Sequence, residues 1–288
     1  MLKERVISAI VLIAIVLAAL LLFSPFYFAL ALGVVVVLGI WEWTQFMHFK
    51  QAFWRYAVTA LSAVFLFLWI YDERNFLDAG RVFELYAEPI LLASVLWWIA
   101  ALFFVVTYPN SSKIWGKHAV LQFPFAFLTL IPFLIGVLRL RLDSYVSNPY
   151  HGLLLLMYVF VLVWAADSGA YFAGRKFGKH KLAPKVSPGK SWQGVIGGLL
   201  TAAIFSALFI YFAGTNLTAN IAIPTFIGLS VVTVAVSILG DLTESMFKRE
   251  AGIKDSSHLI PGHGGILDRV DSLTAAVPFF SYFYFFVL

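Results

Sequence analysis

The 288-residue chain is 61% apolar and only 12% charged, whereas soluble globular domains are about 45–50% apolar and about 25% charged. This composition excludes an ordinary soluble protein, because a soluble surface needs more charges than this chain carries. The chain contains no cysteine, which excludes disulfides, thiolate metal sites and cysteine nucleophiles. Its net charge of +5 is distributed unevenly along the sequence.

Nine apolar segments are long enough to cross a bilayer, since about 20 helical residues span the hydrocarbon layer. The predicted spans are residues 6–23, 26–44, 53–71, 89–108, 119–138, 150–172, 192–213, 221–243 and 270–288. We therefore predict an all-α, polytopic membrane bundle that forms one domain over residues 1–288, with scaffold spans in 1–148 and the functional half in 149–288. The first span follows Lys3, Glu4 and Arg5 and is too long for a signal peptide, so we expect the chain to retain it.

The basic residues gather on one side of this predicted bundle. With the N-terminus in the cytoplasm, the cytoplasmic loops contain His48, Lys50 and Arg55, then Lys113 and Lys117, then the basic residues of 175–190 and of 248–269. The acidic segment 72–88 and the neutral turn 214–220 lie outside, and only Arg139 and Arg141 depart from the pattern. Such a bias is typical of bacterial inner-membrane proteins, and an odd number of spans places the C-terminus opposite the cytoplasm.

Proline interrupts two of the predicted spans. Pro124 and Pro132 fall in the fifth segment and Pro224 in the eighth. Breaks of this kind persist where neighbouring helices or a wet cavity satisfy the freed carbonyl groups. A tolerated kink and a functional break are both compatible with the sequence.

The segment from Gly174 to Lys190 contains six basic residues and no acidic residue. One explanation is an ordinary cytoplasmic loop that contacts anionic lipid headgroups. The other is a phosphate site, because Ser187, Lys190 and Ser191 precede a helix predicted to begin near Trp192, and helix N-termini attract anions. The spacing of a Walker A loop is absent.

Carboxylates at membrane depth form a second group of candidates. Asp167 ends an apolar run, while Asp241 and Glu244 are three residues apart on one helical face, which continues to Lys248. An ionised carboxylate in this position is costly unless it is paired or hydrated. A buried ion pair and a functional site therefore both remain possible for Asp167, and the polar turn 240–245 favours a functional site for Asp241.

The most polar stretch, residues 245–271, lies between the last two spans. Asp268 and Asp271 are three residues apart and can hold Mg²⁺ together with substrate phosphates, although a helix N-cap and a first-turn acid would explain them individually. His263 stands in a Pro-Gly-His-Gly-Gly frame that lets the backbone approach a ligand. Zinc is not expected, because no further histidine or cysteine has ligand spacing.

The polar stretch resembles a known family motif. Its pattern is Ser245-x2-Lys248-Arg249-x4-Lys254-Asp255-x5-Pro261-x-His263-Gly264-Gly265-x2-Asp268-Arg269-x-Asp271. This pattern is similar to the defining motif of the phosphatidate cytidylyltransferases, also called CDP-diglyceride synthases. Supporting similarity extends through residues 167–171, 187–191 and 240–245.

The resemblance implies transfer of CMP from CTP to phosphatidic acid, which gives CDP-diacylglycerol and pyrophosphate. It implies dependence on Mg²⁺ and an associated K⁺. We assign the metal to Asp241, Asp268 and Asp271, with Asp167 and Glu244 behind them. Carried over to this chain, the phosphate-contacting and catalytic residues would be Ser187, Lys190, Ser191, Lys248, Arg249, Lys254, His263, Gly264, Gly265 and Arg269. The expected partners are CTP, phosphatidic acid, the bilayer and a second copy of the chain, with no nucleic acid.

Two other classes of membrane protein compete with this interpretation. An ion or small-anion transporter also carries intramembrane carboxylates, but it should place polar residues on both sides of the membrane. A CTP-dependent polyprenol kinase should lack the complete block from His263 to Asp271. A CDP-alcohol phosphatidyltransferase would need further spaced acids, which do not follow Asp167.

Overall fold

The computed structural model describes residues 2–214, 217–218 and 221–288, without the side chains of residues 2–7 and 9. The side chains of the predicted basic start at Lys3, Glu4 and Arg5, and part of the predicted turn 214–220, therefore lie outside what the structure describes. The described chain is almost entirely helical, with a single two-stranded sheet.

The helices follow one another along the chain with short connections. They are α1 (Leu2–Leu22), α2 (Pro25–Trp43), α3 (Ala52–Asp72), α4 (Arg74–Asp78), α5 (Ala87–Thr107), α6 (Ser112–Trp115), α7 (Ala119–Arg141), α8 (Pro149–Phe177), α9 (Trp192–Ala213), α10 (Ile223–Glu250) and α11 (Leu267–Phe286). The strands β1 (Lys181–Ala183) and β2 (Ser187–Ser191) pair antiparallel between α8 and α9.

The prediction of a polytopic all-α membrane protein is confirmed. Eight of the described helices are long and apolar enough to cross a membrane, and each coincides with one of the predicted spans. The remaining predicted span corresponds to α1, whose described apolar part, Ile10–Leu22, is shorter.

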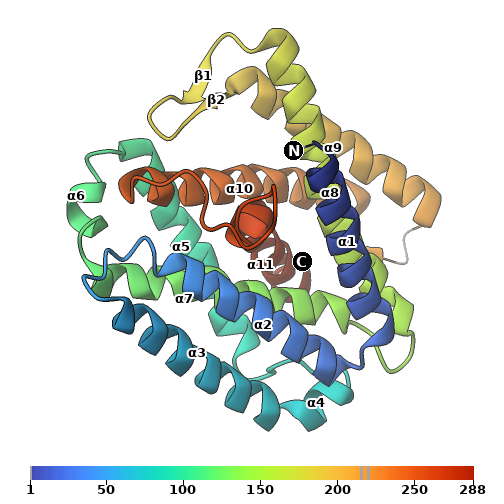
Figure 1. Cartoon of the computed structure of the whole chain (residues 1–288). Coiled ribbons are helices and arrows are strands. Elements are labelled where there is room, and N and C mark those ends of the chain that lie inside the picture. The colour runs from blue at the N-terminus through green and yellow to red at the C-terminus, as the bar shows by residue number, and fades with distance from the viewer. Residues whose placement is uncertain (1, 215–216, 219–220) are drawn as a thin grey trace.

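Helix α11 forms the centre of the bundle (Figure 1). It is seen end-on there and packs against α10, α7 and α5, and its residues Ser272–Pro278 are all buried. By contrast, α3 buries only Ser62, Leu66 and Ile70 and exposes most of its apolar side chains. Because water would oppose such exposure, we assign the outer faces to lipid.

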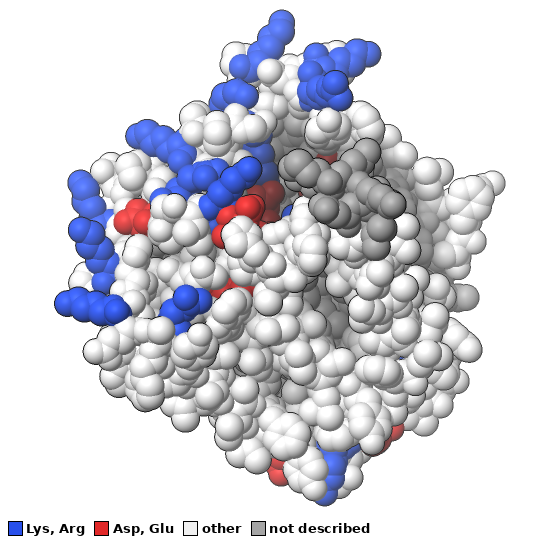
Figure 2. Space-filling view, viewed as in Figure 1, with Lys and Arg blue, Asp and Glu red and all other residues white. Residues whose placement is uncertain are grey.

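Contacts between helix ends show that the helices alternate in direction. At one end of the bundle, the end of α2 meets the start of α11, where Glu42 contacts Leu267. At the other end, the guanidinium of Arg139 in α7 lies 5.1 Å from the ring of Phe285 in α11. On the face shown in Figure 2, most Lys and Arg side chains gather toward the hairpin and α6, and acidic atoms lie in a hollow between them.

Two local predictions need correction. Pro224 does not interrupt a span, because α10 begins at Ile223 and the proline occupies its first turn, where the missing N–H is harmless. The basic segment between α8 and α9 was predicted as a loop, but it forms a β-hairpin in which Ala183 pairs with Ser187. Helix α7 runs through Pro124 and Pro132 as one continuous helix.

Candidate active site

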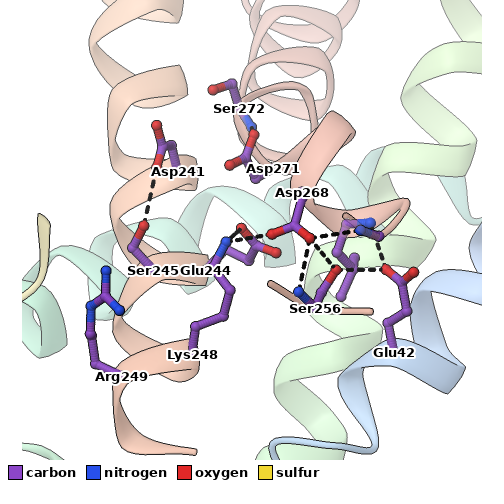
Figure 3. A network of polar contacts seen from close by, with 12 residues as sticks. Glu42, Asp241, Glu244, Ser245, Lys248, Arg249, Ser256, Asp268, Asp271 and Ser272 are labelled. Carbon is purple, nitrogen blue, oxygen red and sulfur yellow. Dashed lines mark hydrogen bonds and ion pairs between the residues drawn. The ribbon is translucent and has the colours of Figure 1, made fainter. Parts of the chain in front are cut away.

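One face of α10 carries the polar residues that the sequence predicted there. Asp241, Ser245 and Lys248 lie on successive turns, and the Ser245 hydroxyl donates to Asp241 Oδ1 over 3.2 Å. Lys248 Nζ donates to Glu244 Oε2 over 2.6 Å (Figure 3). These contacts follow directly from the i, i+4 spacing of a helix.

Lys248 also joins α10 to α11. Its ammonium group lies 2.6 Å from Asp268 Oδ1, and the Lys248, Glu244 and Asp268 side chains are only 12%, 5% and 7% exposed. One buried cation is therefore shared by two carboxylates. Burying charges in this way is tolerable only because each of them has an opposite partner.

The second oxygen of Asp268 anchors the loop between the two helices. Oδ2 accepts hydrogen bonds from the Ser256 N–H at 2.8 Å, the Ser256 hydroxyl at 2.9 Å and the Gly265 N–H at 2.8 Å. The neighbouring Gly264 has φ +81, a conformation that side chains disfavour. A Cβ on Gly264 would lie 2.7 Å from Asp268 Oδ2, so the close packing at this turn requires glycine.

The structure adds a carboxylate that the sequence analysis missed. Glu42, in α2, is fully buried. Its oxygens accept hydrogen bonds from the Ser256 and Ser257 hydroxyls at 3.0 and 2.6 Å and from the Ile266 and Leu267 N–H groups at 2.8 and 2.7 Å. Glu42 thus caps the start of α11 from another helix. The sequence signal that could have identified Glu42 is a carboxylate within an apolar span, the same signal that identified Asp167.

The hairpin brings a second basic residue to α10. Lys190 Nζ, on β2, lies 2.6 Å from Asp241 Oδ2, and both side chains are about one-third exposed or less. Arg249 Nε donates to the Val186 carbonyl oxygen at 3.2 Å, beside Ser187. The hydroxyl of Ser191 accepts from the Gly194 N–H at 3.2 Å and caps α9. The predicted phosphate segment therefore lies against the predicted carboxylates.

Three carboxylates at this end of the bundle retain acceptor capacity. Among the described residues, the Asp271 side chain accepts only from the N–H of Ser272, at 2.7 Å. Oε1 of Glu244 is buried and has no hydrogen-bond partner within the described residues. Asp167 is exposed on α8 and makes no hydrogen bond or ion pair with any described residue. An orphaned buried acceptor needs an explanation, and a bound ligand supplies one.

Helices α10 and α11 approach closely where these carboxylates meet. A Cβ on Gly240 would lie 2.5 Å from the Asp271 carbonyl oxygen and 2.9 Å from the Ala275 Cβ. Figure 3 shows the side chains of Asp241 and Asp271 facing the same space between the two helices, with Glu244 next to them. A glycine at position 240 is what allows this approach.

The arrangement of these carboxylates suits a metal ion that keeps part of its water shell. Within residues 2–214, 217–218 and 221–288, no three Asp, Glu, His or Cys side chains converge as a complete set of protein ligands. Asp241 and Asp271, with the orphaned Glu244 Oε1, nevertheless provide hard oxygen donors. Mg²⁺ is commonly held by one or two carboxylates and completes its shell with water and substrate phosphates. The residues present fit such an ion.

A cavity of about 500 Å³ opens at the loop between α10 and α11, where its lining residue Gly264 lies next to Asp268. Its lining includes four potentially cationic side chains, Lys254, His258, His263 and Arg269, and one acid, Asp255. Backbone groups of the glycine-rich segment 262–264 complete the wall. Cationic side chains and accessible backbone around a hollow are suited to a polyphosphate. The predicted phosphate contacts thus divide between this cavity and the hairpin.

Known proteins match this chain over its whole length. The model of a family described as the cytidylyltransferase family matches residues 3–287. A phosphatidate cytidylyltransferase of Haemophilus influenzae is 67% identical over 288 residues, which is 100% of both chains. A phosphatidate cytidylyltransferase of Pseudomonas aeruginosa is 44% identical over 281 residues, covering 98% of this chain and 96% of the other.

Proposed function

The chain belongs to the cytidylyltransferase family and is a membrane-spanning nucleotidyltransferase, and from this premise we propose that it transfers CMP from CTP to phosphatidic acid. The products are CDP-diacylglycerol and pyrophosphate. The matched family corresponds to the predicted transferase and not to the transporter or polyprenol kinase alternatives.

One structural observation carries the proposal. Carboxylates with unused acceptor capacity, Asp271 and Glu244, lie on α11 and α10, and the loop that joins these two helices carries a cavity lined by Lys254, His263 and Arg269. The carboxylates, which have too few hydrogen-bond donors from the protein, would bind the metal, and the basic side chains around the cavity would bind the phosphates. Together they are complementary to a metal–triphosphate complex. A transporter for simple ions would have no need for this division.

The proposed reaction needs positioning and charge neutralisation rather than a protein nucleophile. A phosphate oxygen of phosphatidic acid attacks the α-phosphorus of CTP, a new P–O bond forms, and the bond between the α-phosphorus and its bridging oxygen to the β-phosphate breaks. The electron pair leaves with pyrophosphate. Phosphate monoesters have a second pKa of about 6 and are largely dianionic at neutral pH, so no general base is required. The main barrier to the reaction is the electrostatic repulsion between the phosphate of phosphatidic acid and the triphosphate of CTP.

We assign the residues to distinct tasks on this basis. Asp241 and Asp271, with Glu244 beside them, would hold Mg²⁺, which when bound neutralises the phosphates and orients them. Asp268 is already occupied by Lys248, Ser256 and Gly265, so we give it a positioning role instead of the direct metal contact predicted from its spacing. Asp167, which is exposed on α8, is a candidate for the associated K⁺.

Basic residues would contact the phosphates from two sides. Lys254, His263 and Arg269 surround the cavity and are placed for the departing pyrophosphate. Lys190 is held at Asp241 in this structure and would be able to contact a phosphate oxygen if Asp241 held Mg²⁺ instead. The neighbouring hydroxyls of Ser187 and Ser191 and the N–H group of Gly264 offer further donors at the same end of the bundle, whereas the N–H of Gly265 already donates to Asp268.

The substrates also agree with an orientation in which the site faces the cytoplasm of a bacterial inner membrane. CTP is water-soluble, whereas phosphatidic acid keeps its acyl chains in the bilayer. Lys and Arg gather around the same end of the bundle as the site (Figure 2), as expected for cytoplasmic loops. The C-terminus, near Phe285, then lies on the opposite side.

The test is a transfer assay with protein purified in detergent, CTP labelled at the α-phosphate, and phosphatidic acid in mixed micelles. We expect label in the lipid phase and an equimolar release of pyrophosphate, both requiring Mg²⁺ and both abolished by EDTA. Replacing KCl with NaCl tests the K⁺ assignment in the same assay. Glu88→Gln, an exposed acid in the first turn of α5, serves as the matched control.

The outcomes separate the parts of the proposal. Folded protein that releases no pyrophosphate with both substrates present would refute the reaction. Transfer that persists in EDTA would keep the reaction and refute the metal. Pyrophosphate released without phosphatidic acid would indicate CTP hydrolysis, and therefore a different acceptor.

A further inference from the structure

A serine in the first helix reaches the glycine-rich loop of the site. The hydroxyl oxygen of Ser8, in α1, lies 2.8 Å from His263 Nδ1 and 3.1 Å from the carbonyl oxygen of Pro261. The two residues are more than 250 positions apart. Figure 1 shows the start of α1 toward the end of the bundle that carries the hairpin.

The remainder of α1 explains why this contact is informative. Most of its described side chains are exposed, among them Ile10 at 61% and Ile15 at 60%. Its other end is held by the Arg141 guanidinium, which donates from Nε and from a terminal nitrogen to the Leu20 carbonyl oxygen over 3.2 and 2.8 Å. The helix is thus connected by polar contacts at two points, and one of them is a residue of the candidate site.

The donors and acceptors around Ser8 determine what His263 can offer. A hydroxyl carries one proton, and a carbonyl oxygen can only accept. When Ser8 donates to Nδ1, the neutral ring carries its proton on Nε2. When Ser8 donates to another acceptor, such as the Pro261 carbonyl oxygen, Nδ1 must donate to Ser8, and Nε2 then bears an N–H only in the charged imidazolium. The arrangement in which Ser8 donates to Nδ1 therefore gives the neutral ring an N–H at Nε2, the ring nitrogen left for the cavity.

We propose that Ser8 is a positioning residue for the nucleotide: it fixes the imidazole of His263 so that Nε2 donates to a phosphate oxygen of CTP. The ligand would sit in the cavity with Lys254, His258 and Arg269, which face the same space as His263. Asp255 is the one acid in that lining. The inference rests on the proposed function, and it extends the site to α1, which carries none of the motif residues.

The closing experiment measures KM for CTP at saturating phosphatidic acid. Ser8→Ala removes the hydroxyl, and loss of one hydrogen bond that orients a charged contact predicts a rise in KM of about tenfold, with kcat changed less than about twofold. Ser8→Thr retains a hydroxyl and should behave like the parent enzyme, whereas Ser8→Val, of the same shape as threonine, should behave like Ser8→Ala. Ile10→Ala, an exposed position on the same helix, is the matched control.

A double-mutant cycle distinguishes positioning from a merely structural role. If Ser8 acts through His263, Ser8→Ala should have no further effect on KM in a His263→Ala background. Independent, multiplying effects would overturn the inference, and so would a Ser8→Ala enzyme indistinguishable from the parent. Failure of the parent enzyme to form CDP-diacylglycerol would instead overturn the proposed function.

Discussion

Two sets of carboxylates lie within one end of this bundle and differ in how completely the protein satisfies them. Glu42 and Asp268, here called the saturated pair, each accept several hydrogen bonds from loop 251–266 and the start of α11. Asp241, Glu244 and Asp271, here called the open face, retain unused oxygens or a solvent-accessible ion pair. The residue types are the same, so hydrogen-bond saturation distinguishes the carboxylates that fix the fold from those that we propose bind the ligand.

The strongest test of this comparison is Asp271→Asn. We expect kcat to fall by about 1,000-fold or more, since charge stabilisation is the main catalytic term in phosphoryl transfer. Stability should stay the same or rise, because the change removes a charge with one backbone donor as its only described hydrogen-bond partner. Transfer rates and thermal unfolding in detergent check both parts. If the variant kept a tenth of the parent activity, Asp271 would not be a ligand-binding carboxylate of the open face.

Glu42→Gln tests the saturated pair and should affect stability first. An amide has donors on one side, so at least one of the N–H groups of Ile266 and Leu267 or the serine hydroxyls loses its acceptor. We expect a loss of about 2–4 kcal/mol in the free energy of unfolding. Unfolding in SDS, measured against Glu88→Gln, is suitable. If the variant were as stable as the parent but inactive, Glu42 would act in the reaction, like the carboxylates of the open face, and not in the scaffold.

Lys190→Met sharpens the comparison at Asp241, the member of the open face with which Lys190 forms an ion pair. Loss of a cation that contacts phosphate should lower kcat/KM for CTP by about 10- to 100-fold. Stability should change by less than about 1 kcal/mol, because the ion pair with Asp241 is partly solvated. Lys185→Met, exposed on the same hairpin, is the control. Equal effects of the two substitutions would indicate a general electrostatic role for the hairpin.

Ser245→Ala should have the smallest effect. Its hydroxyl donates one hydrogen bond of 3.2 Å to Asp241, so we expect a stability loss of about 1 kcal/mol or less and a change in kcat of about threefold or less. Steady-state kinetics beside the Asp271→Asn series would detect it. A loss as large as that of Asp271→Asn would show that the hydroxyl itself contacts the reacting groups.

The contacts that the sequence could predict are those within one helix. The spacing of Asp241, Glu244 and Lys248 placed them on one face of α10, and the pair Asp268 and Asp271 shared a face of α11, because helical periodicity determines both. The apolar runs predicted every long helix for the same reason. Local patterns of this kind do not depend on how the helices pack.

The contacts that escaped prediction are those between elements. Glu42 meets Leu267 across 225 positions, and no periodicity relates α2 to the start of α11. The bridge from Lys248 to Asp268 likewise depends on the close approach at Gly240. The hairpin was missed because glycine, proline and lysine are depleted in strands, whereas here tertiary contacts with α10 support it.

The two polar attachments of α1 also bear on the order in which the chain assembles during synthesis. In this chain α1 is made before its partners, Arg141 and His263, which follow more than a hundred and more than two hundred residues later. Neither polar contact can form until those residues have been made. The docking of α1 at His263 therefore has to wait for the loop between α10 and α11.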